Sequence, residues 1–510
     1  MVNQHHHIKK YKWNTKDYKQ LFQSSSEFIK IQSQQFYMPF FSLFFYIHNT
    51  KQSHKKIDLL RKYYLKEITE IIKDRYYNSN LILKGILYDS GQNLNKEVEL
   101  FCKIIPILDP MHCINNNYNL IIKKNHHLPS SYNYNTFDKI NDINNSAYID
   151  VFCSYLFSEL TVNNILPTFA IFYGSFNGIG NYKYEISEEY SDLRVDKCFN
   201  QTVNKGFEIN MYISDSEEES SDDNSNEEES EESEEESEEE LKKDRLENDS
   251  ENDSENDSEN DSENDSNFSS NNEYIASIKN IPLQLLFIEK LEYTLEDFLL
   301  SDEYNDEILI SCLFQISFAL NYLQKHYKFT HNDLHINNVM YTTTTKKYLY
   351  YKLNNIYFRV PTYGKIFKII DFGRSIFQFK NKIYMNDVFK KYGEAHGQYY
   401  YPNQVKFYKN KSEENIKPNY HFDLCRLSMT ILEELESTKI NNNYLLCFLQ
   451  KLCIDRNNNN FCDMNDDFDL YIAISKNACN SLPKNILHDK LFKSYRIHKK
   501  KFPTNYYFHS

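Results

Sequence analysis

The sequence predicts an α+β protein, in which a small antiparallel sheet with one main helix precedes a larger and mainly helical part. Three features carry this prediction. Apolar segments of strand type occur early, long amphipathic helices follow after residue 300, and one strongly acidic segment interrupts the early part. At 510 residues the chain exceeds one ordinary domain, but a single two-part fold with insertions would fill it.

The sheet is predicted from short apolar segments bounded by polar residues. Four of them are typical of β-strands: NLILKGILYD (80–89), VELFCKIIPIL (98–108), PTFAIFYGSF (167–176) and LQLLFIEKL (283–291). Between the second and the third lies SAYIDVFCSYLFSELTVNNI (146–165), whose apolar spacing predicts an amphipathic helix that ends before Pro167. We expect this helix to be the main helix beside the sheet.

The later part is predicted to be mainly helical. TLEDFLLS (294–301) has the signature of a short helix with Thr294 as its N-cap and an acid three residues on. DEILISCLFQISFALNYLQKH (306–326) has apolar residues at helical spacing and predicts a long helix that leads to Thr330. The alternating segment 348–364 is instead typical of an extended hairpin that turns at two asparagines.

Residues 214–266 hold the acidic excess of the chain. They contain 28 Asp and Glu against three basic residues and end in five tandem ENDS repeats. The formal net charge of the whole chain is −15, so the remainder is positive by about 10 charges. Such a segment cannot bury enough apolar surface to offset its chain entropy, and we predict a disordered acidic core within an insert of about 177–280. It could bind basic partners or mimic nucleic acid.

Several classes of protein are disfavoured by composition. The ten cysteines form no C-x-x-C pair, which favours buried thiols in a reducing compartment over a disulfide framework. No apolar segment has the length of a membrane span and the N-terminus lacks the apolar core of a secretion signal. We therefore expect a cytoplasmic protein that binds no membrane, with no direct nucleic-acid binding.

Two short motifs near the middle of the chain have the chemistry of phosphoryl transfer. In HNDLHINN (331–338), Asn338 follows Asp333 by five residues, and in IIDFG (369–373), Asp371 follows an apolar strand. Transfer of the γ-phosphoryl group of ATP needs a carboxylate that orients the acceptor hydroxyl and oxygen ligands for Mg²⁺. Each motif is weak alone, but their order and their predicted flanking elements favour a joint site.

These motifs resemble those of the protein kinase superfamily. HNDLHINN, VPTYGKIFKIIDFGRSI (360–376) and PNYHFDLCRL (418–427) resemble more closely the serine/threonine protein kinases of giant DNA viruses of the mimivirus type. The resemblance implies a two-lobed fold, with an N-terminal extension (1–66), a small lobe (67–290) interrupted by the acidic insert, and a larger helical lobe with a C-terminal extension (291–510). In an infected cell it would place the protein in the host cytoplasm or the virion.

The resemblance also assigns roles to single residues. Lys103, in ELFCKI, would hold the α and β phosphates of ATP, with Glu159 as its partner on the main helix. Main-chain groups of Glu289 and Leu291 would meet adenine. The resemblance further implies that Asp333 orients the acceptor hydroxyl and that Asn338 and Asp371 hold Mg²⁺.

FDLCRLSMTILEEL (422–435) resembles the kinase helix whose first acid hydrogen-bonds the backbone of the catalytic loop. In this chain that acid is Asp423. Its expected role is indirect, because it would hold the loop and not touch the nucleotide.

The chain departs from the kinase pattern at several positions. No glycine-rich G-x-G-x-x-G precedes Lys103, Asn332 replaces the arginine of the catalytic loop, and His335 replaces the lysine that follows it. No A-P-E motif is present, and GEAHGQY (393–399) is expected to occupy that stretch. These departures concern the covering of the phosphates and the type of acceptor.

Three functions remain compatible with these residues. The first is an active protein kinase with an unidentified protein substrate, for which the resemblance favours serine and threonine as acceptors. The second is a small-molecule phosphotransferase of the choline or aminoglycoside type, whose loops also carry H-x-D. The third is a pseudokinase that keeps the fold as a binding module, which the missing glycines favour and the intact Asp333, Asn338 and Asp371 disfavour.

Overall fold

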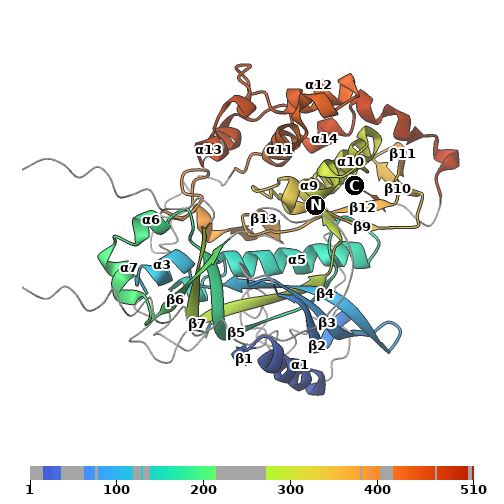
Figure 1. Ribbon diagram of the computed structural model, residues 1–510. Coiled ribbons are helices and arrows are strands. Elements are labelled where there is room, and N and C mark those ends of the chain that lie inside the picture. Colours follow the sequence, from blue (N-terminus) through green and yellow to red (C-terminus); the bar gives the residue numbers. More distant parts are fainter. Residues whose placement is uncertain are drawn as a thin grey trace, which may run out of the picture.

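The computed structural model of the chain is a mixed α+β fold with a large antiparallel sheet and several helices (Figure 1). It describes residues 15–35, 62–74, 79–118, 128–129, 138–213, 272–379, 382–391, 393–401, 417–465, 468–503 and 508–509. The acidic core 214–266 lies outside the described residues, so its predicted disorder stays a prediction.

Seven strands form the large sheet. They are β1 (Gln32–Gln35), β2 (Tyr63–Asp74), β3 (Leu81–Asp89), β4 (Leu94–Pro106), β5 (Phe172–Glu185), β6 (Phe207–Ile213) and β7 (Asn272–Glu289). Their order is β1-β5-β7-β4-β3-β2, with β6 also paired to β7, and every pairing is antiparallel. The four strand segments predicted from the sequence all fall within or next to these strands.

The main helix beside the sheet is α5 (Ser146–Val162), as the apolar spacing predicted. Asn145 caps its first turn by accepting a hydrogen bond from the amide of Ala147. Most of its residues are buried, because α5 lies between the sheet and the helices drawn above it in Figure 1. Two short helices, α3 (Pro110–Ile114) and α4 (Asp138–Asn141), precede it.

The later part of the chain is built around one long helix, α10 (Asp306–Tyr327). The others are α9 (Leu295–Leu300), α11 (Phe422–Lys439), α12 (Asn443–Leu452), α13 (Phe468–Asn477) and α14 (Pro483–Ile486). Thr294 and Asp297 form the capping box that was predicted for α9. By length and composition α10 could cross a membrane, but 83% of the apolar window is buried in the fold, as expected of a core helix.

Three small sheets accompany these helices. They comprise β8 (Tyr293–Thr294), β9 (Val339–Thr343) and β12 (Lys365–Ile369); β10 (Tyr348–Leu353), β11 (Ile356–Pro361), β15 (Arg496–Ile497) and β16 (Phe508–His509); and β13 (Ile376–Phe379) with β14 (Lys382–Met385). The predicted hairpin 348–364 is confirmed as β10 and β11. Its turn residue Asn354 has φ +52°, a left-handed conformation that asparagine tolerates.

Single 3₁₀ turns complete the described fold. They are η2 (Ile336–Asn338), η3 (Asp387–Phe389), η4 (Phe461–Asp463), η5 (Lys490–Tyr495) and η6 (Lys499–Lys501). The first of these turns ends the motif HNDLHINN and leads directly into β9.

The predicted bounds of the insert, about 177 and 280, are wrong. Both positions lie inside strands, because β5 continues to Glu185 and β7 begins at Asn272. The two strands pair from Phe172 with Ile288 to Glu185 with Ile275, so both extend the sheet beyond the predicted small lobe. Between them, α6 (Tyr190–Leu193), α7 (Lys197–Thr202) and β6 pack through Phe199 and Phe207 onto the extension. The folded sheet therefore reaches directly to both ends of the undescribed acidic segment.

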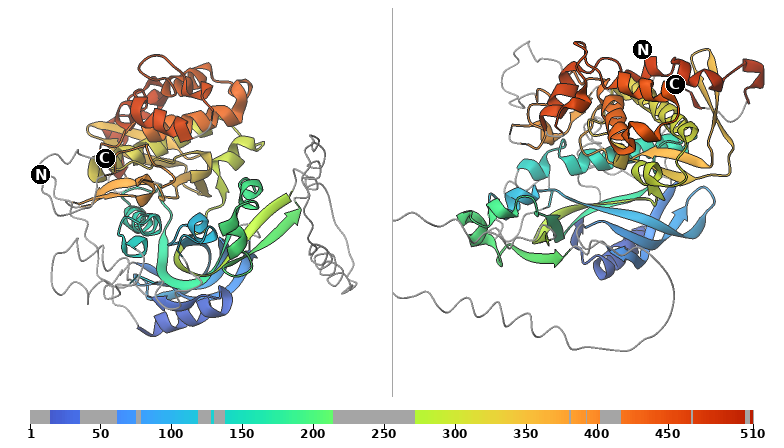
Figure 2. Two further views of the ribbon diagram at one scale, coloured as in Figure 1. Left: turned by 90° about the vertical axis from the view of Figure 1, so that its left-hand side faces the viewer. Right: turned by 45° about the horizontal axis from the view of Figure 1, so that its top comes forward.

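Residues 15–35 of the predicted N-terminal extension pack on the large sheet. α1 (Thr15–Phe28) covers the face opposite α5 (Figures 1 and 2), and Ser24 accepts a hydrogen bond from the amide of Ile68. β1 then pairs with β5, and Ile31 lies against two glycines of that strand. A Cβ atom at Gly178 would approach Ile31 Cγ2 to 2.2 Å, so glycine is required for this docking.

We predict that Gly178→Ala weakens the docking of residues 21–35, because the added methyl group displaces Ile31. Amide hydrogen exchange of that segment should become faster, while exchange in α10 stays unchanged. The variant Ile31→Ala leaves a cavity, and the double variant should be less destabilised than the sum of the two single variants. Strictly additive losses would show that the two side chains do not share this contact.

Candidate active site

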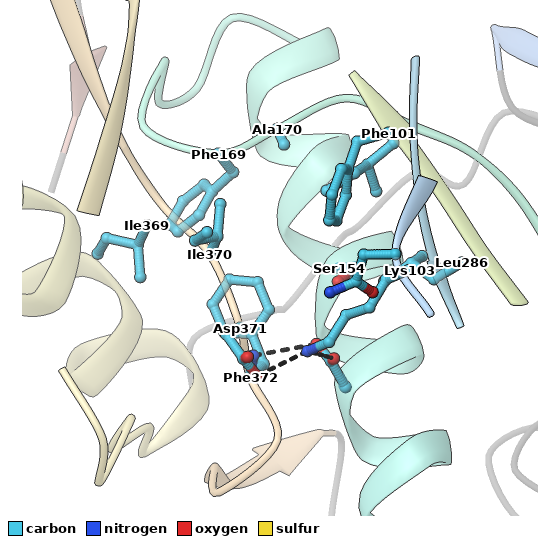
Figure 3. A pocket seen from close by; sticks show the side chains of 13 residues that line it. Phe101, Lys103, Ser154, Phe169, Ala170, Leu286, Ile369, Ile370, Asp371 and Phe372 are labelled. Atoms are coloured by element: carbon cyan, nitrogen blue, oxygen red, sulfur yellow. Dashed lines mark hydrogen bonds and ion pairs between the residues drawn. The ribbon is translucent and has the colours of Figure 1, made fainter. Parts of the chain in front are cut away.

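The candidate site is centred on Lys103, near the end of β4. Its ammonium Nζ lies 2.7 Å from Asp150 Oδ2 on α5 and 2.9 Å from Asp371 Oδ1, which follows β12 (Figure 3). The side chain of Asp150 is only 3% exposed, whereas that of Asp371 is 40% exposed. One lysine therefore joins the sheet, the main helix and the second sequence motif.

The prediction that Glu159 is the helix partner of Lys103 is wrong. Asp150 holds that position, and Glu159 instead accepts a hydrogen bond from Asn163 at 3.2 Å. The two acids lie nine residues apart on α5, which corresponds to about 14 Å along a helix axis. Lys103 faces the first half of α5, so an acid in its last turns cannot reach the ammonium group.

The charged groups at this site shift the pKa values of one another. Burial lowers the pKa of Lys103, but the two carboxylates more than offset this effect and hold it above its usual range. Burial also raises the pKa of Asp150, against the opposing effect of Lys103. For Asp371, burial would raise the pKa, but Lys103 and the amide of Gly373 lower it to about 2. Asp371 is therefore ionised at neutral pH and remains accessible from the cavity.

Asp150 also fixes the backbone of the second motif. Its Oδ1 accepts a hydrogen bond from the amide of Phe372 at 3.0 Å, while its Oδ2 binds Lys103. Asp371 has φ +57°, a left-handed conformation that costs free energy outside glycine. The phenyl ring of Phe372 packs against Phe157 of α5 with ring centroids 5.1 Å apart. These contacts hold the carboxylate of Asp371 towards Lys103.

The first motif is held by a buried carboxylate, as predicted. Asp423, at the start of α11, accepts hydrogen bonds from the amides of His331 (3.0 Å) and Asn332 (2.9 Å) and is fully buried. Burial raises its pKa, although His331 and these amides oppose the shift. The imidazole Nε2 of His331 lies 2.9 Å from the carbonyl oxygen of Ile370 and so joins the two motifs. The predicted structural role of Asp423 is confirmed.

Asp333 and Asn338 lie next to this junction. The side-chain Nδ2 of Asn338 donates to the backbone carbonyl oxygen of Asp333 at 2.8 Å. The backbone carbonyl oxygen of Asn338 accepts a hydrogen bond from the amide of Ile370 at 3.1 Å. Asn338 is thus one backbone hydrogen bond away from Asp371. The structure brings Asp333, Asn338, Asp371 and Lys103 into one connected set.

The carboxylate of Asp333 has partners that the sequence did not suggest. The hydroxyl of Tyr471, on α13, donates to Asp333 Oδ1 at 3.0 Å, and Arg374 Nη1 lies 3.6 Å from the same oxygen. The guanidinium groups of Arg374 and Arg426 lie over the Tyr471 ring, 5.4 and 5.3 Å from its centroid. Tyr471 is separated from Asp333 by 138 positions, and no motif links the two in the sequence.

A cavity of about 160 Å³ adjoins the lysine and its two carboxylates. Apolar side chains supply much of its remaining wall, among them Phe101, Leu286 and Phe169 (Figure 3). Ile288 also lines it. Ser154, one turn after Asp150, also reaches the cavity. An apolar hollow that ends at a few charged groups is the usual form of a small-molecule site.

Glu289 and Leu291, expected beside adenine, are not among the residues that line this cavity. The amide of Glu289 donates to the carbonyl oxygen of Ile171, and its carboxylate binds Lys368 at 2.6 Å. Leu291 is 7% exposed. Their proposed contact with adenine stays a prediction, and Phe101 and Ile288 are better placed for an apolar ring.

The donor atoms fit a hard cation such as Mg²⁺. Nδ2 of Asn338 is engaged by the carbonyl oxygen of Asp333, so its Oδ1 faces away from that bond. Asp371 binds Lys103 and Gly373 through Oδ1, which leaves Oδ2 without a hydrogen bond to any described residue. Among the described residues no group of three His, Cys, Asp or Glu could hold a metal, so the phosphates would have to complete the coordination.

No protein-family model matches the chain, and no curated protein matches it either. The kinase resemblance therefore rests on the residues and their geometry alone.

We predict that Asp423→Ala lowers the free energy of unfolding more than Asp371→Ala. Removing Asp423 leaves two buried amides without acceptors, at about 1–3 kcal/mol each. Asp371 is partly exposed, and Lys103 keeps Asp150 as its partner after the change. Urea denaturation, monitored by far-ultraviolet circular dichroism, measures both losses. Equal losses would show that Asp423 does not support the loop.

Proposed function

We propose that the chain is a protein kinase, which transfers the γ-phosphoryl group of ATP to protein hydroxyls, with serine and threonine as the favoured acceptors. The observation that carries the proposal is the ion-paired set of Lys103, Asp150 and Asp371, joined by His331 and Asn338 to the loop of Asp333. Each motif alone is weak evidence for a kinase, and the contacts that connect the two motifs strengthen the assignment.

The arrangement of the sheet supports a two-lobed kinase-like fold. In that fold the strands on either side of the acidic segment are neighbours, and β5 and β7 do pair along most of their length. The lysine strand β4 pairs with the other side of β7, and the main helix α5 packs on the same sheet. The helices after residue 294 would form the second, larger lobe.

The residues present define a role for each group. Lys103 would hold the α and β phosphates, and Asp333 would orient the acceptor hydroxyl and take up its proton. Asn338 and Asp371 would hold Mg²⁺, which neutralises negative charge on the phosphates when it is bound. The contribution of the protein is then mainly positioning and electrostatic stabilisation.

Tyr471 extends this scheme. Its hydroxyl and Arg374 both lie on Oδ1 of Asp333, whereas Oδ2 has no hydrogen bond to a described residue. We infer that these groups fix the carboxylate so that Oδ2 can meet the acceptor. Nearby, Glu394 pairs with the other end of Arg374 at 3.7 Å.

A second candidate is a pseudokinase that binds partners without phosphoryl transfer. The hydrogen bond from Tyr471 to Asp333 also favours the pseudokinase, because it already occupies one of the two carboxylate oxygens. A small-molecule phosphotransferase is the third candidate, and activity on a free small alcohol but on no protein would favour it. One assay separates all three.

We predict that the chain transfers label from γ-labelled ATP, with Mg²⁺, to a basic or an acidic generic protein acceptor. Asp333→Asn should lower the rate by at least about a hundredfold, because it removes a base worth ~10²–10⁴ in rate. Asp192→Asn, in the remote helix α6, makes the same chemical change and should leave the rate unchanged. Wild-type transfer no greater than that of Asp333→Asn, on proteins and on small alcohols, would reject the enzyme in favour of the pseudokinase.

We also predict that Asp150→Asn weakens nucleotide binding or turnover by at least about tenfold, whereas Glu159→Gln leaves both unchanged. The first substitution removes a carboxylate that positions Lys103, and the second changes an acid elsewhere on the same helix. Titration with a fluorescent ATP analogue measures affinity separately from transfer. A larger effect of Glu159→Gln would restore the original assignment.

A further inference from the structure

The hairpin formed by β10 and β11 presents a surface that contributes no residue to the lining of the cavity beside Lys103. Alternate residues of the hairpin face inwards, where Leu349, Tyr351 and Phe358 are buried in the main core. The intervening residues face outwards, and the register places Tyr350 opposite Arg359 and Lys352 opposite Tyr357. One side of the hairpin is therefore core, and the other is free of it.

The outward side carries rings and cations. We name it the aromatic face, and it consists of Tyr348, Tyr350, Lys352, Tyr357, Arg359 and Phe502. The guanidinium of Arg359 lies 4.7 Å from the centroid of the Tyr348 ring, and the ammonium of Lys352 lies 5.9 Å from that of Tyr357. Phe502 packs edge-on against Tyr357 at 4.8 Å and Tyr350 at 6.0 Å.

The aromatic face is only partly covered. Tyr348 is 40% exposed, Arg359 is exposed, and Tyr350 and Tyr357 are half-buried. Tyr363, just beyond β11, is 45% exposed and adds another ring beside the hairpin. Tyrosine is intermediate in its tendency to be buried, so single exposed rings are ordinary, but rings gathered in one patch beside polar groups can mark a binding site.

Positive charge surrounds the aromatic face. β15 pairs with β11 and places Arg496 beside it, and η6 adds the exposed side chains of Lys499, Lys500 and Lys501. The segments 346–363 and 490–502 together contain ten lysines and arginines and no acid. Two acids lie nearby: Asp489 precedes the second segment, and Glu307 is close to Tyr363. Their two negative charges are far fewer than the positive charges of the two segments.

We propose that the aromatic face binds single-stranded nucleic acid, with lysines on the phosphates and bases stacked on tyrosine rings and on the Arg359 guanidinium. Proteins that bind single strands combine a basic track with aromatic stacking platforms, and the sheet surface offers both. This proposal replaces the expectation from the sequence of no direct nucleic-acid binding.

The acidic segment 214–266 of the same chain is the competing occupant, because its charge complements the face equally well. Its only apolar residues are Leu241 and Leu246, so it has no flat groups to stack on the tyrosines. Charge alone would attract either ligand, whereas the rings distinguish them. The segment is then expected to act as a weak internal competitor for the nucleic acid.

The test uses the full chain and a fluorescein-labelled oligothymidylate of about 16 nucleotides, the upper site size of known single-strand modules. Fluorescence anisotropy should show binding, and the variant Tyr350→Ala with Tyr357→Ala should weaken it by at least about fivefold. If the double variant does not fold, Tyr348→Leu serves as the alternative, because it changes a more exposed ring. It should also weaken binding of the oligonucleotide. Removal of residues 214–266 should strengthen binding, because the formal charge changes from −15 to about +10.

Charge variants separate the role of the phosphates from that of the bases. Lys499→Gln with Lys500→Gln should reduce the slope of log affinity against log salt by about 1.4, that is about 0.7 for each cation. The matched control is Lys197→Gln with Lys205→Gln, two exposed lysines near α7 on the sheet extension, which should change neither slope nor affinity. Equal effects of the two lysine pairs would overturn the proposal.

Heparin, a polyanion without bases, provides the last comparison. Its binding should respond to the lysine variants but not to the tyrosine variants. If folded tyrosine variants bind the oligonucleotide as tightly as the wild-type chain does, the face is an electrostatic site for acidic protein segments, and the proposal is wrong.

Discussion

The ion pairs of Lys103 connect the three parts of the protein on which the candidate site depends. The lysine comes from the sheet, Asp150 from the main helix, and Asp371 from the end of β12. A buried charge without partners would cost several kcal/mol, so each of the three elements stabilises the placement of the other two. Because Asp150 also accepts the amide of Phe372, the same carboxylate sets both the lysine and the backbone before Gly373. The site is therefore a consequence of how helix α5 docks on the sheet.

A second buried carboxylate does for the loop what Asp150 does for the lysine. Asp423 is fully buried, its hydrogen bonds to described residues come from the backbone amides of His331 and Asn332, and these amides offset its desolvation. Both motifs need support of this kind, because Asn332 in the loop has φ +65° and Asp371 in the second motif has φ +57°. Left-handed backbone outside glycine costs roughly 1–3 kcal/mol and persists only where the surroundings determine it.

Asparagine tolerates that conformation well, which gives a physical reason for Asn332 in place of arginine. The side-chain Nδ2 of Asn332 donates to the carbonyl oxygen of Arg374, and its Oδ1 accepts from the hydroxyl of Tyr399, so neutral hydrogen bonds join the two motifs there.

Local signals in the sequence predicted most elements of the fold, and contacts between distant residues account for the errors. Strand alternation, the capping box of Thr294 and the hairpin at Asn354 depend on neighbouring residues and were predicted correctly. The choice of Glu159 over Asp150 failed because both acids lie on one helix, and only the docking of α5 decides which faces Lys103. Tyr471 could not be predicted, since nothing in α13 indicates that its hydroxyl meets Asp333. The insert boundary was misplaced because polar strand residues in 177–185 hide a strand that depends on pairing with β7.

The long pairing of β5 with β7 explains how the chain can carry a large acidic segment at this point. β6 ends at Ile213 and β7 begins at Asn272, and these two residues are partners in the β6–β7 ladder. The segment therefore leaves and returns at one place, and the entropic cost of closing such a loop grows by only about 0.6 kcal/mol for each doubling of its length. Its anchoring point is the free end of the sheet extension, whereas the aromatic face lies on the later part of the chain (Figure 1). If the proposal above holds, contact between the acidic segment and the aromatic face would depend on attraction between their opposite charges, which salt weakens.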